Sequence, residues 1–543
     1  MERSGSEIIL ESLQRHGVRT VAGMPGGASL PLYDALARSS LRHVLVRHEQ
    51  AAGFIAQGMA RASGRTAVCL ATSGPGATNL VTAIADAHLD SIPLLAITGQ
   101  VPTALIGTSA FQEVDTIAMV RPIAKHAEQV RDVRELEAAL ARAFAIARHG
   151  RPGPVLLDVP KDVQQARCDT LPLTAAELDA AREPSAEQLQ RFLQLLAASE
   201  RPVLYAGGGI VHSGAHAALA RLAHAQQIPV TCTLLGLGCF DPRSPLYLGM
   251  LGMHAAPYTN LALNEADLLI CIGARFDDRA TGKLSEFCPN ARTIHVDIDA
   301  RELGKLRALE LGVACDARRF LEHLEPLVQR TRASWLARVH ALRERHPLPP
   351  SGFAARVIDR IGAARRPGTI VCTDVGQHQM WVAQRMPFDR PRSLLTSGGL
   401  GSMGFGLPAA IGAALESGRP ALCISGDGSL PLNIQELATL AELGLDVTVV
   451  VLDNGHLGLV RQQQTLFYGA RLSASTFERA TDFVALARAY GIEALRTTDL
   501  AELAAALDRP GPRLIQVPID AREMVLPMVP PGAANHDMLE YGP

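Results

Sequence analysis

Two polar groups in the last third of the chain have the spacing of a metal and phosphate site. The run Gly426-Asp427-Gly428-Ser429 follows the apolar segment ALCIS, and Asp453-Asn454 follows the apolar segment VTVVVL. Residues 430–452 between them have room for one helix, over 433–443, and one return strand, which predicts a right-handed crossover. Asp427 and Asn454 would then end neighbouring parallel strands, at the sheet edge where such folds bind ligands.

The residue types at this edge suit a magnesium ion and a diphosphate. An aspartate oxygen, an amide oxygen and a backbone carbonyl form a partial shell of hard ligands, which Mg²⁺ accepts when phosphate oxygens and water complete it. Gly426 and Gly428 let the backbone approach a diphosphate, whose charge the N-terminus of the following helix favours. An ordinary glycine-capped strand–turn–helix is the alternative, but the asparagine at this spacing, with strands on both sides, favours a binding site.

The elements that must position these groups are short apolar runs separated by glycine-rich turns and amphipathic stretches. This pattern is typical of strand–turn–helix units, so we expect an α/β protein of three doubly wound parallel-sheet domains. The segments 68–79 and 422–433 share the order strand, glycine turn, helix, which predicts one architecture used twice. The clearest expected strands are 67–71, 94–98, 155–159, 203–206, 268–272, 293–298, 421–425 and 447–452.

Two polar stretches divide the chain into parts of ordinary domain size. They lie near 167–187 and 330–352, and the second contains the sequence HPLPP. The tail is rich in proline and glycine, and it could fold over a site as a lid or could fray. The predicted domains are 1–165, 186–330 and 351–528, followed by the tail at 529–543.

The composition argues against several classes of protein. The 543 residues include 52 basic and 54 acidic side chains, for a net charge of -2, so no surface for nucleic acid or anionic lipid is expected. No apolar run approaches the length of a membrane helix, and the N-terminus lacks the pattern of a signal peptide. The nine cysteines form no CxxC pair, which argues against a zinc site and favours a cytoplasmic protein.

The spacing of the first motif resembles the thiamine-diphosphate-binding motif of thiamine enzymes. That family usually has Asn-Asn at 453–454, and its ligand is the second position, Asn454 here. The resemblance implies that Asp427, Asn454 and the carbonyl of His456 hold Mg²⁺. The run RHEQAAGFIAQGMAR resembles the family's activating-glutamate segment, which implies that Glu49 hydrogen-bonds the aminopyrimidine of the cofactor. Without the resemblance, Glu49 would be an ordinary charge at a helix N-terminus.

Further stretches narrow the resemblance to the catalytic subunit of the acetohydroxyacid (acetolactate) synthases, over essentially the whole chain. They include GMPGGASLPLYDAL, ATSGPGATNL, FQEVD, GARFDDRATGKL, TDVGQHQMW and LGLVRQQQ. The resemblance implies a thiamine-diphosphate-binding fold used twice, around a central Rossmann-like domain with a structural FAD. The implied thiamine diphosphate contacts are Glu49, Pro25, Thr72, Gly76, Asn79, Val375, Gly376, Gln377, His378, Gly401, Met403, Gly426, Asp427, Gly428, Ser429, Asn454, His456, Leu457 and Gly458.

The central part contains acidic residues near the ends of two expected strands. This arrangement often binds ribose in dinucleotide folds, although charge at strand ends is the plainer explanation. FAD-free catabolic acetolactate synthases resemble the chain less in this region. Resemblance to the FAD-containing synthases implies that the flavin lies along Arg151, Gly207, Gly208, Thr233, Gly252, Met253, His254, Gly273, Arg275, Asp277, Asp297 and Asp316.

The implied reaction decarboxylates pyruvate and transfers the hydroxyethyl unit to a second 2-keto acid. Pyruvate as acceptor gives 2-acetolactate, and 2-ketobutyrate gives 2-aceto-2-hydroxybutyrate, both early intermediates of branched-chain amino acid synthesis. Arg279 would hold the acceptor, because an arginine fork binds a carboxylate at two points. The implied catalytic positions are Glu49, Gly27, Phe111, Gln112, Lys161, Arg279 and Gln463.

One departure from the family bears on the acceptor. The family has a tryptophan where this chain has Gln463, so we expect weaker preference for 2-ketobutyrate and weaker binding of sulfonylurea-type inhibitors. A thiamine carboligase or acetyltransferase with another acceptor, and a non-catalytic paralogue, are the alternatives. Because the family's thiamine site joins two chains, a homodimer or tetramer is implied, and a small regulatory subunit could be a further partner.

Overall fold

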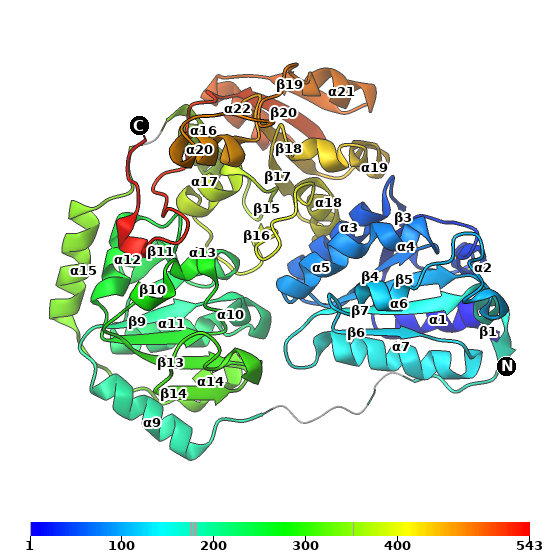
Figure 1. The fold of residues 1–543 in the computed structure, drawn as a ribbon, viewed down its shortest axis with the longest axis horizontal. Coiled ribbons are helices and arrows are strands. Elements are labelled where there is room, and N and C mark those ends of the chain that lie inside the picture. Colours follow the sequence, from blue (N-terminus) through cyan, green and yellow to red (C-terminus); the bar gives the residue numbers. More distant parts are fainter. Residues whose placement is uncertain (1, 174–175, 177–181, 351, 543) are drawn as a thin grey trace.

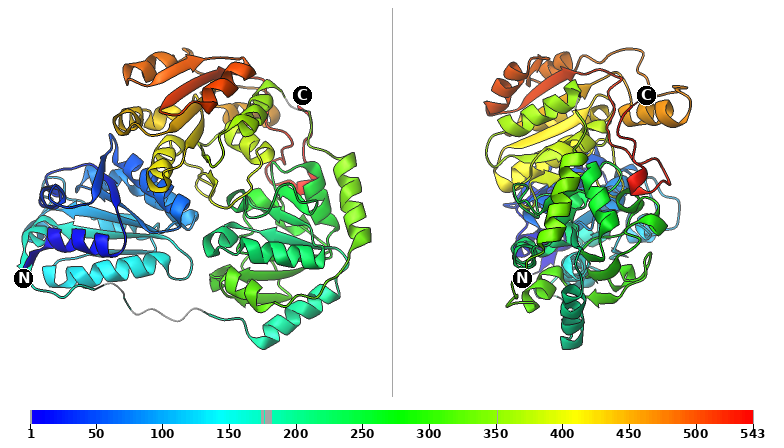
Figure 2. Two further views of the ribbon diagram at one scale, coloured as in Figure 1. Left: turned by 180° about the vertical axis from the view of Figure 1, so that it is seen from behind. Right: turned by 90° about the vertical axis from the view of Figure 1, so that its left-hand side faces the viewer.

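The computed structural model describes residues 2–173, 176, 182–350 and 352–542. Three α/β domains lie around a common centre, with the N-terminal and middle domains on opposite sides and the C-terminal domain across both (Figure 1). The same arrangement is visible from behind and from the side (Figure 2). Each domain contains one six-stranded sheet in which all paired strands are parallel. This confirms the expected fold class.

The N-terminal sheet has the order β3-β2-β4-β5-β7-β6. A short antiparallel ladder of β1 (Arg3–Ser4) and β8 (Arg167–Cys168) closes the domain. The sheet strands are β2 (Thr20–Gly23), β3 (Arg42–Leu45), β4 (Ala67–Ala71), β5 (Leu94–Gln100), β6 (His126–Gln129) and β7 (Pro154–Pro160). The helices are α1 (Gly5–Arg15), α2 (Leu30–Leu36), α3 (Glu49–Ser63), α4 (Pro75–Asn79), α5 (Val81–Leu89), α6 (Thr116–Val120), α7 (Val133–Arg148) and α8 (Lys161–Gln165).

The C-terminal sheet has the order β16-β15-β17-β18-β20-β19. When the six strands of each sheet are numbered in chain order, the C-terminal and N-terminal sheets have the same strand order. This confirms the prediction of one architecture used twice. The strands are β15 (Ile370–Thr373), β16 (Leu394–Leu395), β17 (Ala421–Gly426), β18 (Val447–Asp453), β19 (Glu493–Arg496) and β20 (Arg513–Pro518). The helices are α16 (Phe353–Ala364), α17 (Gln377–Arg385), α18 (Gly406–Ser417), α19 (Glu436–Leu443), α20 (Gly458–Phe467), α21 (Phe483–Ala489) and α22 (Leu500–Asp508).

The middle sheet has the order β11-β10-β9-β12-β13-β14, which is the strand order of dinucleotide-binding Rossmann folds. Its strands are β9 (Pro202–Ala206), β10 (Val230–Cys232), β11 (Tyr247–Met250), β12 (Leu268–Ile272), β13 (Arg292–Asp297) and β14 (Leu311–Ala314). The helices are α9 (Ala186–Ala197), α10 (Gly208–Ser213), α11 (His216–Gln226), α12 (Pro257–Glu265), α13 (Asp278–Thr281), α14 (Ala317–His323) and α15 (Ala333–Arg345).

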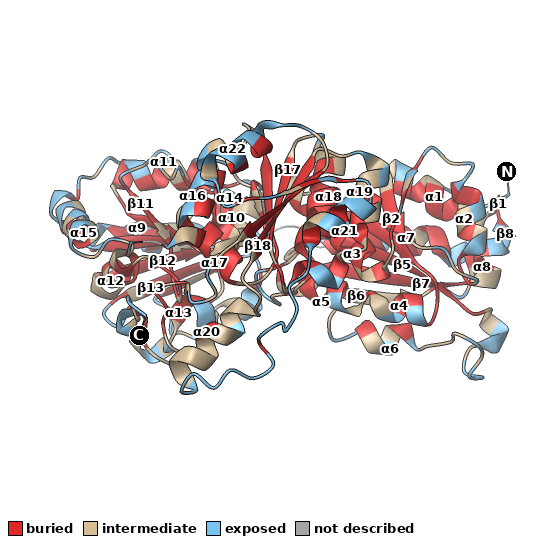
Figure 3. Ribbon diagram, turned by 90° about the horizontal axis from the view of Figure 1, so that it is seen from above, coloured by how far each residue is buried: buried red, intermediate tan, exposed pale blue. Residues whose placement is uncertain are grey.

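The N-terminal and C-terminal domains share one hydrophobic core. Helix α3 of the N-terminal domain packs against α18 of the C-terminal domain, and Ile55, Met59, Leu407 and Ile411 belong to the same buried cluster. Figure 3 shows that the sheet strands are buried, whereas the exposed residues lie mainly on the outer helices and loops. The burial of apolar side chains from both domains therefore fixes α3 relative to the C-terminal sheet.

The prediction of a linker at 330–352 was wrong over most of that range. Helix α15 lies in it and packs against α12 of the middle domain. Trp335, Val339 and Leu342 of this helix are buried, and the indole Nε1 of Trp335 donates a hydrogen bond to the carbonyl oxygen of Pro202 at 3.1 Å. These apolar side chains recur at helical spacing, so the middle domain extends to the end of α15. The other expected linker lies partly outside the described residues.

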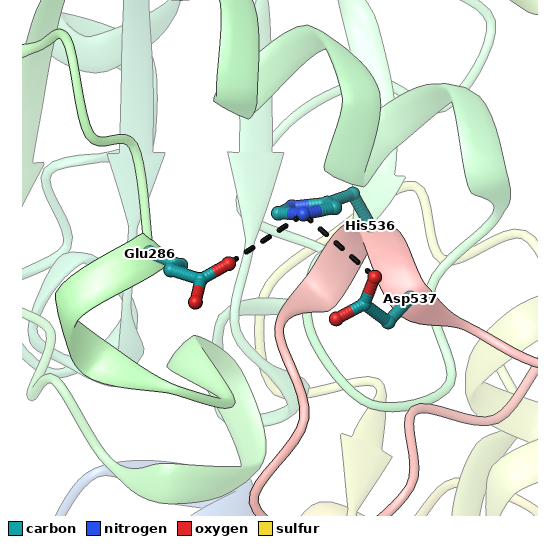
Figure 4. A group of neighbouring side chains, drawn as sticks. All are labelled: Glu286, His536 and Asp537. Carbon is teal, nitrogen blue, oxygen red and sulfur yellow. Dashed lines mark ion pairs between the residues drawn. The ribbon is translucent and has the colours of Figure 1, made fainter.

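The described part of the tail, 529–542, lies against the middle domain beside α13. The backbone N–H of Val529 donates to the carbonyl of Met253 at 2.9 Å, and the N–H of Lys283 donates to the carbonyl of Ala533 at 2.9 Å. His536 lies 3.6 Å from Glu286 and 3.8 Å from Asp537, measured from its Nε2 to a carboxylate oxygen of each (Figure 4). Hydrogen bonds and surface ion pairs thus fasten the tail, while its role as a lid stays a prediction.

No helix in the described part of the chain is both long and apolar enough to span a lipid bilayer.

Candidate functional site

The strand ends that carry Asp427 and Asn454 are neighbours. Strands β17 and β18 pair in parallel, with Gly426 opposite Leu452, and the N–H of Asp427 donates to the carbonyl of Leu452 at 3.3 Å. Asp427 is the first residue after β17, and Asn454 is the first after β18. The crossover between the two strands contains a 3-10 turn (Leu430–Asn433) and α19, which confirms the predicted strand–helix–strand unit.

The carboxylate of Asp427 has the environment of a cation ligand. Its side chain is buried, and Oδ2 has no hydrogen-bond partner among the described residues. Burial, together with the charge of Asp453, raises the pKa of Asp427 to about 7. A nearby positive charge stabilises the ionised form of a buried carboxyl group, so Asp427 is suited to bind Mg²⁺.

Two helices begin beside Asn454. Its amide Nδ2 donates to Gln377 Oε1 at 3.2 Å, and Gln377 is the first residue of α17. Helix α20 begins at Gly458, where an added Cβ would lie only 2.2 Å from that same Gln377 oxygen. Because the free N–H groups of two helix N-termini converge here, the site favours an anion such as a diphosphate.

Four more residues expected at the cofactor, His378, Gly428, Ser429 and Leu457, lie against the turn after β17 or form part of it. His378 is buried, its Nε2 has no partner within the described residues, and burial lowers its pKa to about 3, so the ring is neutral. Leu457 lies against Gly428, and Ser429 Oγ accepts a hydrogen bond from the N–H of Gly426 at 3.1 Å. The structure thus brings together most of the C-terminal set; the others are at the start of α17 (Val375, Gly376), in the glycine-rich loop (Gly401, Met403) and after β18 (His456).

Glu49 lies in a separate group within the N-terminal domain. It is the first residue of α3, is buried, and its Oε2 accepts a hydrogen bond from Asn79 Nδ2 at 2.8 Å. Gly76 lies between Glu49 and Thr72, and the Thr72 hydroxyl is buried without a partner among the described residues. Together with Pro25, which precedes the Gly26 that lies against Thr72, these residues form the N-terminal set expected at the pyrimidine.

A cavity of about 780 Å³ lies where the three domains meet. Ten of the twelve residues expected along FAD line it: Arg151, Gly208, Thr233, Met253, His254, Gly273, Arg275, Asp277, Asp297 and Asp316. Gly207 and Gly252 lie one residue before Gly208 and Met253 in the chain. The cavity wall also includes Val375, Gly401, Arg279 and Gln463. The shape and the Rossmann strand order fit a dinucleotide.

Several polar residues line this cavity. Asp297 is the last residue of β13, and burial raises its pKa to about 6. Asp277 caps α13 by accepting hydrogen bonds from the N–H groups of Arg279 at 3.1 Å and Ala280 at 3.2 Å. The side chain of Arg279 is 63% exposed, and its nearest carboxylate is Asp278 at 3.8 Å. Its guanidinium is therefore available to a ligand carboxylate.

Several expected catalytic positions are not in this cavity. Phe111 is 88% exposed on the loop between β5 and α6, and the next residue, Gln112, has a left-handed backbone with φ of 61°. Lys161 begins α8, and Gly27 precedes α2. Neither these four residues nor Glu49 lines the cavity that contains Arg279 and Gln463. We call the group around Glu49 the N-terminal half-site, and the group around Asp427 and Asn454 the C-terminal half-site.

Two buried acids near these half-sites were missed by the sequence analysis. Asp374 lies at the end of β15, where its Oδ1 accepts hydrogen bonds from the N–H groups of Val375 at 2.9 Å and Gly404 at 2.8 Å. Asp90 lines the cavity and is fully buried at the side chain. Asp374 lies in TDVGQHQMW, one of the stretches that carry the family resemblance, but no residue pattern there or around Asp90 in HLDS indicates that the aspartate is buried.

Comparison with known proteins agrees with this geometry. Family models of thiamine pyrophosphate enzymes match the N-terminal TPP binding domain at residues 3–119, the central domain at 189–324 and the C-terminal TPP binding domain at 374–517. The large subunit of acetolactate synthase isozyme 1 from Escherichia coli (strain K12) is 52% identical, over 99% of this chain and 97% of that protein. The chain belongs to the acetolactate synthase family.

Other relatives extend this similarity to distant organisms. The isozyme 2 large subunit from the same E. coli strain is 46% identical, over 99% of both chains. A probable acetolactate synthase large subunit from Methanocaldococcus jannaschii is 44% identical, over 97% of this chain and 94% of that protein. The resemblance read from the sequence motifs is therefore confirmed, as is the expectation of a thiamine diphosphate enzyme.

Proposed function

We propose that the chain is the catalytic subunit of an acetolactate synthase that condenses two 2-keto acids with loss of CO₂. The observation that carries this proposal is the buried carboxylate of Asp427 beside Asn454, whose Oδ2 has no hydrogen-bond partner among the described residues, in a chain similar to acetolactate synthases along 99% of its length. The product 2-acetolactate is an early intermediate of branched-chain amino acid synthesis.

The C-terminal half-site would hold the diphosphate end of the cofactor. Asp427, Asn454 and the carbonyl of His456 would bind Mg²⁺, and the N-termini of α17 and α20 would receive the phosphate charge. Thiamine diphosphate supplies a nucleophilic carbon and an electron sink for the decarboxylation. Glu49 would hold a proton at the pyrimidine ring nitrogen, since its carboxylate is buried and fixed by Asn79.

The cavity between the domains would hold FAD and the acceptor side of the reaction. Its lining by Arg275, Asp297 and the turns after the Rossmann strands supports a dinucleotide there. Arg279 would orient the acceptor through the acceptor's carboxylate, because its guanidinium is exposed and its one acidic partner, Asp278, lies no nearer than 3.8 Å. Gln463 lies on the same wall and would face the acceptor side chain.

A second copy of the chain would complete the catalytic site. Glu49 and its neighbours form one half-site, and Asp427 and its neighbours form the other. Phe111, on the loop between β5 and α6 of the same domain as Glu49, is 88% exposed. An exposed aromatic side chain of this kind is typical of an interface. The relatives are named large subunits, which supports a smaller partner for this chain as well.

Product analysis tests the proposed function directly. The purified protein with thiamine diphosphate, Mg²⁺ and FAD is given an equal mixture of pyruvate and 2-ketobutyrate, and the products are identified by mass spectrometry. We expect 2-acetolactate, with 2-aceto-2-hydroxybutyrate as the smaller product. Protein that binds its cofactors and forms neither compound would contradict the proposal and favour a different acceptor or a non-catalytic paralogue.

Gln463→Trp is expected to shift the product ratio toward 2-aceto-2-hydroxybutyrate by about tenfold. An indole face on the cavity wall gives the extra methyl group of 2-ketobutyrate an apolar contact that an amide does not. Inhibition by a sulfonylurea should become stronger in the same variant. The measurement is the ratio of the two products at equal substrate concentrations.

Val460→Trp is the matched control for this change. Val460 lies on the same helix, α20, is 44% exposed and is not part of the cavity wall. We expect its product ratio to equal that of the wild type. An unchanged ratio in Gln463→Trp, or an equal shift in Val460→Trp, would contradict a role of position 463 in acceptor preference.

A further inference from the structure

A buried cluster of charges joins the N-terminal domain to the C-terminal domain. It consists of Arg61 near the end of α3, Asp86 in α5 and Asp90 just after α5, and we name these three residues the charged clamp. Arg61 Nη2 lies 3.1 Å from Asp86 Oδ2 and 2.8 Å from Asp90 Oδ2. The two aspartate side chains are fully buried and that of Arg61 is 5% exposed.

The clamp holds the glycine-rich loop 397–403 that precedes α18. Asp90 accepts hydrogen bonds from the N–H of Gly398 at 2.9 Å and from the N–H of Gly399 at 2.7 Å, one at each carboxylate oxygen. Asp86 Oδ1 accepts hydrogen bonds from the hydroxyls of Ser397 and Ser402, the latter at 3.1 Å. The loop is therefore tied to the N-terminal domain by charged acceptors, which bind more strongly than neutral ones.

The fit between clamp and loop is close. A Cβ at Gly399 would lie 2.8 Å from the Cβ of Leu89 and 3.0 Å from Asp90 Oδ1, so only glycine fits there. Arg61 also donates to the carbonyl of Thr396 at 2.9 Å and lies over the ring of Phe405, at 5.0 Å from its centroid. The clamp thus contacts both ends of the loop as well as its middle.

The loop forms part of both proposed cofactor positions. Gly398, Gly399 and Gly401 line the cavity proposed for FAD, and Met403 is expected to support thiamine diphosphate. None of these residues has a side-chain hydrogen bond of its own that could fix the loop. Its position is set by the acceptors of the N-terminal domain on one side and by two residues of the C-terminal domain on the other. Asp374 accepts from the N–H of Gly404, and Gln379 Nε2 donates to the carbonyl of Ser397 at 3.0 Å.

A contribution to stability alone is a weak explanation for this cluster. One guanidinium faces two carboxylates, and removing three charges from water costs more than their mutual attraction returns unless further hydrogen bonds satisfy them. For the two carboxylates, those further hydrogen bonds come from Ser397, Gly398, Gly399 and Ser402, all in the loop. Arg61 also donates to Gln57 Oε1 at 2.8 Å and to the carbonyl of Thr396 at 2.9 Å. The cluster and the loop therefore depend on each other for their geometry.

We propose that Arg61, Asp86 and Asp90 are positioning residues that set the glycine-rich loop at the junction of the FAD and thiamine diphosphate sites. This inference rests on the proposed cofactor positions. Disturbing the clamp weakens cofactor binding through the loop, even though Asp86 does not line the cavity and lies behind Ser397 and Ser402.

Asp86→Asn tests the clamp in the full-length protein, because Asp90 lines the cavity itself and Asp86 does not. Asparagine has one acceptor oxygen, so it cannot accept hydrogen bonds both from Arg61 and from the hydroxyls of Ser397 and Ser402, and the loop cannot keep its position. We expect the dissociation constant for FAD, measured by flavin fluorescence on the apoprotein, to rise about tenfold or more. The KM for thiamine diphosphate should rise as well, while kcat at saturating cofactors falls less.

Glu137→Gln is the matched control. Glu137 is a buried carboxylate of the same domain that pairs with Arg3 and Arg15 on the outer side of α7 and has no contact with the loop. This variant should lower the thermal midpoint of unfolding and leave FAD affinity unchanged. The comparison separates loss of a buried ion pair from loss of loop position.

The outcomes are distinguishable. If Asp86→Asn fails to fold, Ser402→Ala removes only one hydroxyl donor of the loop, at a residue that does not line the cavity, and should still weaken FAD binding. FAD binding as tight as in the wild type, in whichever variant folds, would overturn the clamp. Wild-type protein that bound no FAD would overturn the proposed flavin position itself, and the clamp with it.

Discussion

Replacing Glu49 with glutamine is expected to lower kcat for acetolactate formation by about two to four orders of magnitude. The buried carboxylate at the start of α3 is fixed by Asn79 at 2.8 Å, and it would hold a proton at the pyrimidine ring nitrogen. A glutamine of the same shape carries no charge and cannot stabilise that proton. The rate of deuterium exchange at the reactive carbon of bound thiamine diphosphate should fall with kcat, because the exchange reports the same activation.

A loss of activity in Glu49→Gln must be distinguished from a loss of folding or of cofactor binding. FAD and Mg²⁺-dependent thiamine diphosphate binding should persist in Glu49→Gln, since the expected contacts of FAD and the expected ligands of Mg²⁺ and the diphosphate lie elsewhere, and glutamine can still hydrogen-bond the pyrimidine. Glu137→Gln again serves as the control, because it removes a buried glutamate charge from the same domain. Turnover in Glu49→Gln above about a tenth of the wild-type value would show that Glu49 does not activate the cofactor.

Much of the fold could be predicted because its signals are local. Apolar runs bounded by glycine identified β4 and β12 without error in their bounds, and the length of the segment between Asp427 and Asn454 allowed only one helix and one strand. Neighbouring parallel strands follow from that length and from the handedness of the crossover. The pairing of the two strand ends that carry Asp427 and Asn454 could therefore be predicted from the sequence, since it depends on a single strand–helix–strand unit.

The parts that escaped prediction depend on contacts between distant segments. In α15, Trp335, Val339 and Leu342 have helical spacing, but the surrounding charges and the following HPLPP resemble a linker, and only packing on α12 distinguishes the two. Asp86 and Asp90 resemble surface charges on an amphipathic helix. Their burial follows from Ser397–Ser402 contacts more than three hundred residues away in the chain, which no local pattern encodes.

Asp427→Asn is expected to raise the Mg²⁺ concentration needed for half-maximal thiamine diphosphate binding by about a hundredfold or more. Loss of a group that only supports a metal ligand typically costs 10- to 100-fold in affinity, and Asp427 would be a ligand itself. The variant keeps the shape of the side chain and the strand pairing, but removes the one buried carboxylate whose oxygen lacks a partner in the described chain. Quenching of tryptophan fluorescence by the cofactor during a Mg²⁺ titration measures the effect.

Asp453→Asn is the control with the closest match in sequence and place. Asp453 ends β18 immediately before Asn454, and its Oδ2 accepts a hydrogen bond from Gln516 Nε2 at 2.7 Å, so it is turned toward β20. Asparagine is the usual residue of thiamine enzymes at this position, and removing the charge of Asp453 also eases the ionisation of Asp427. We therefore expect Asp453→Asn to bind Mg²⁺ at least as well as the wild type. A larger loss in Asp453→Asn than in Asp427→Asn would show that the cation lies on the β20 side of β18, and that the ligand assignment is wrong.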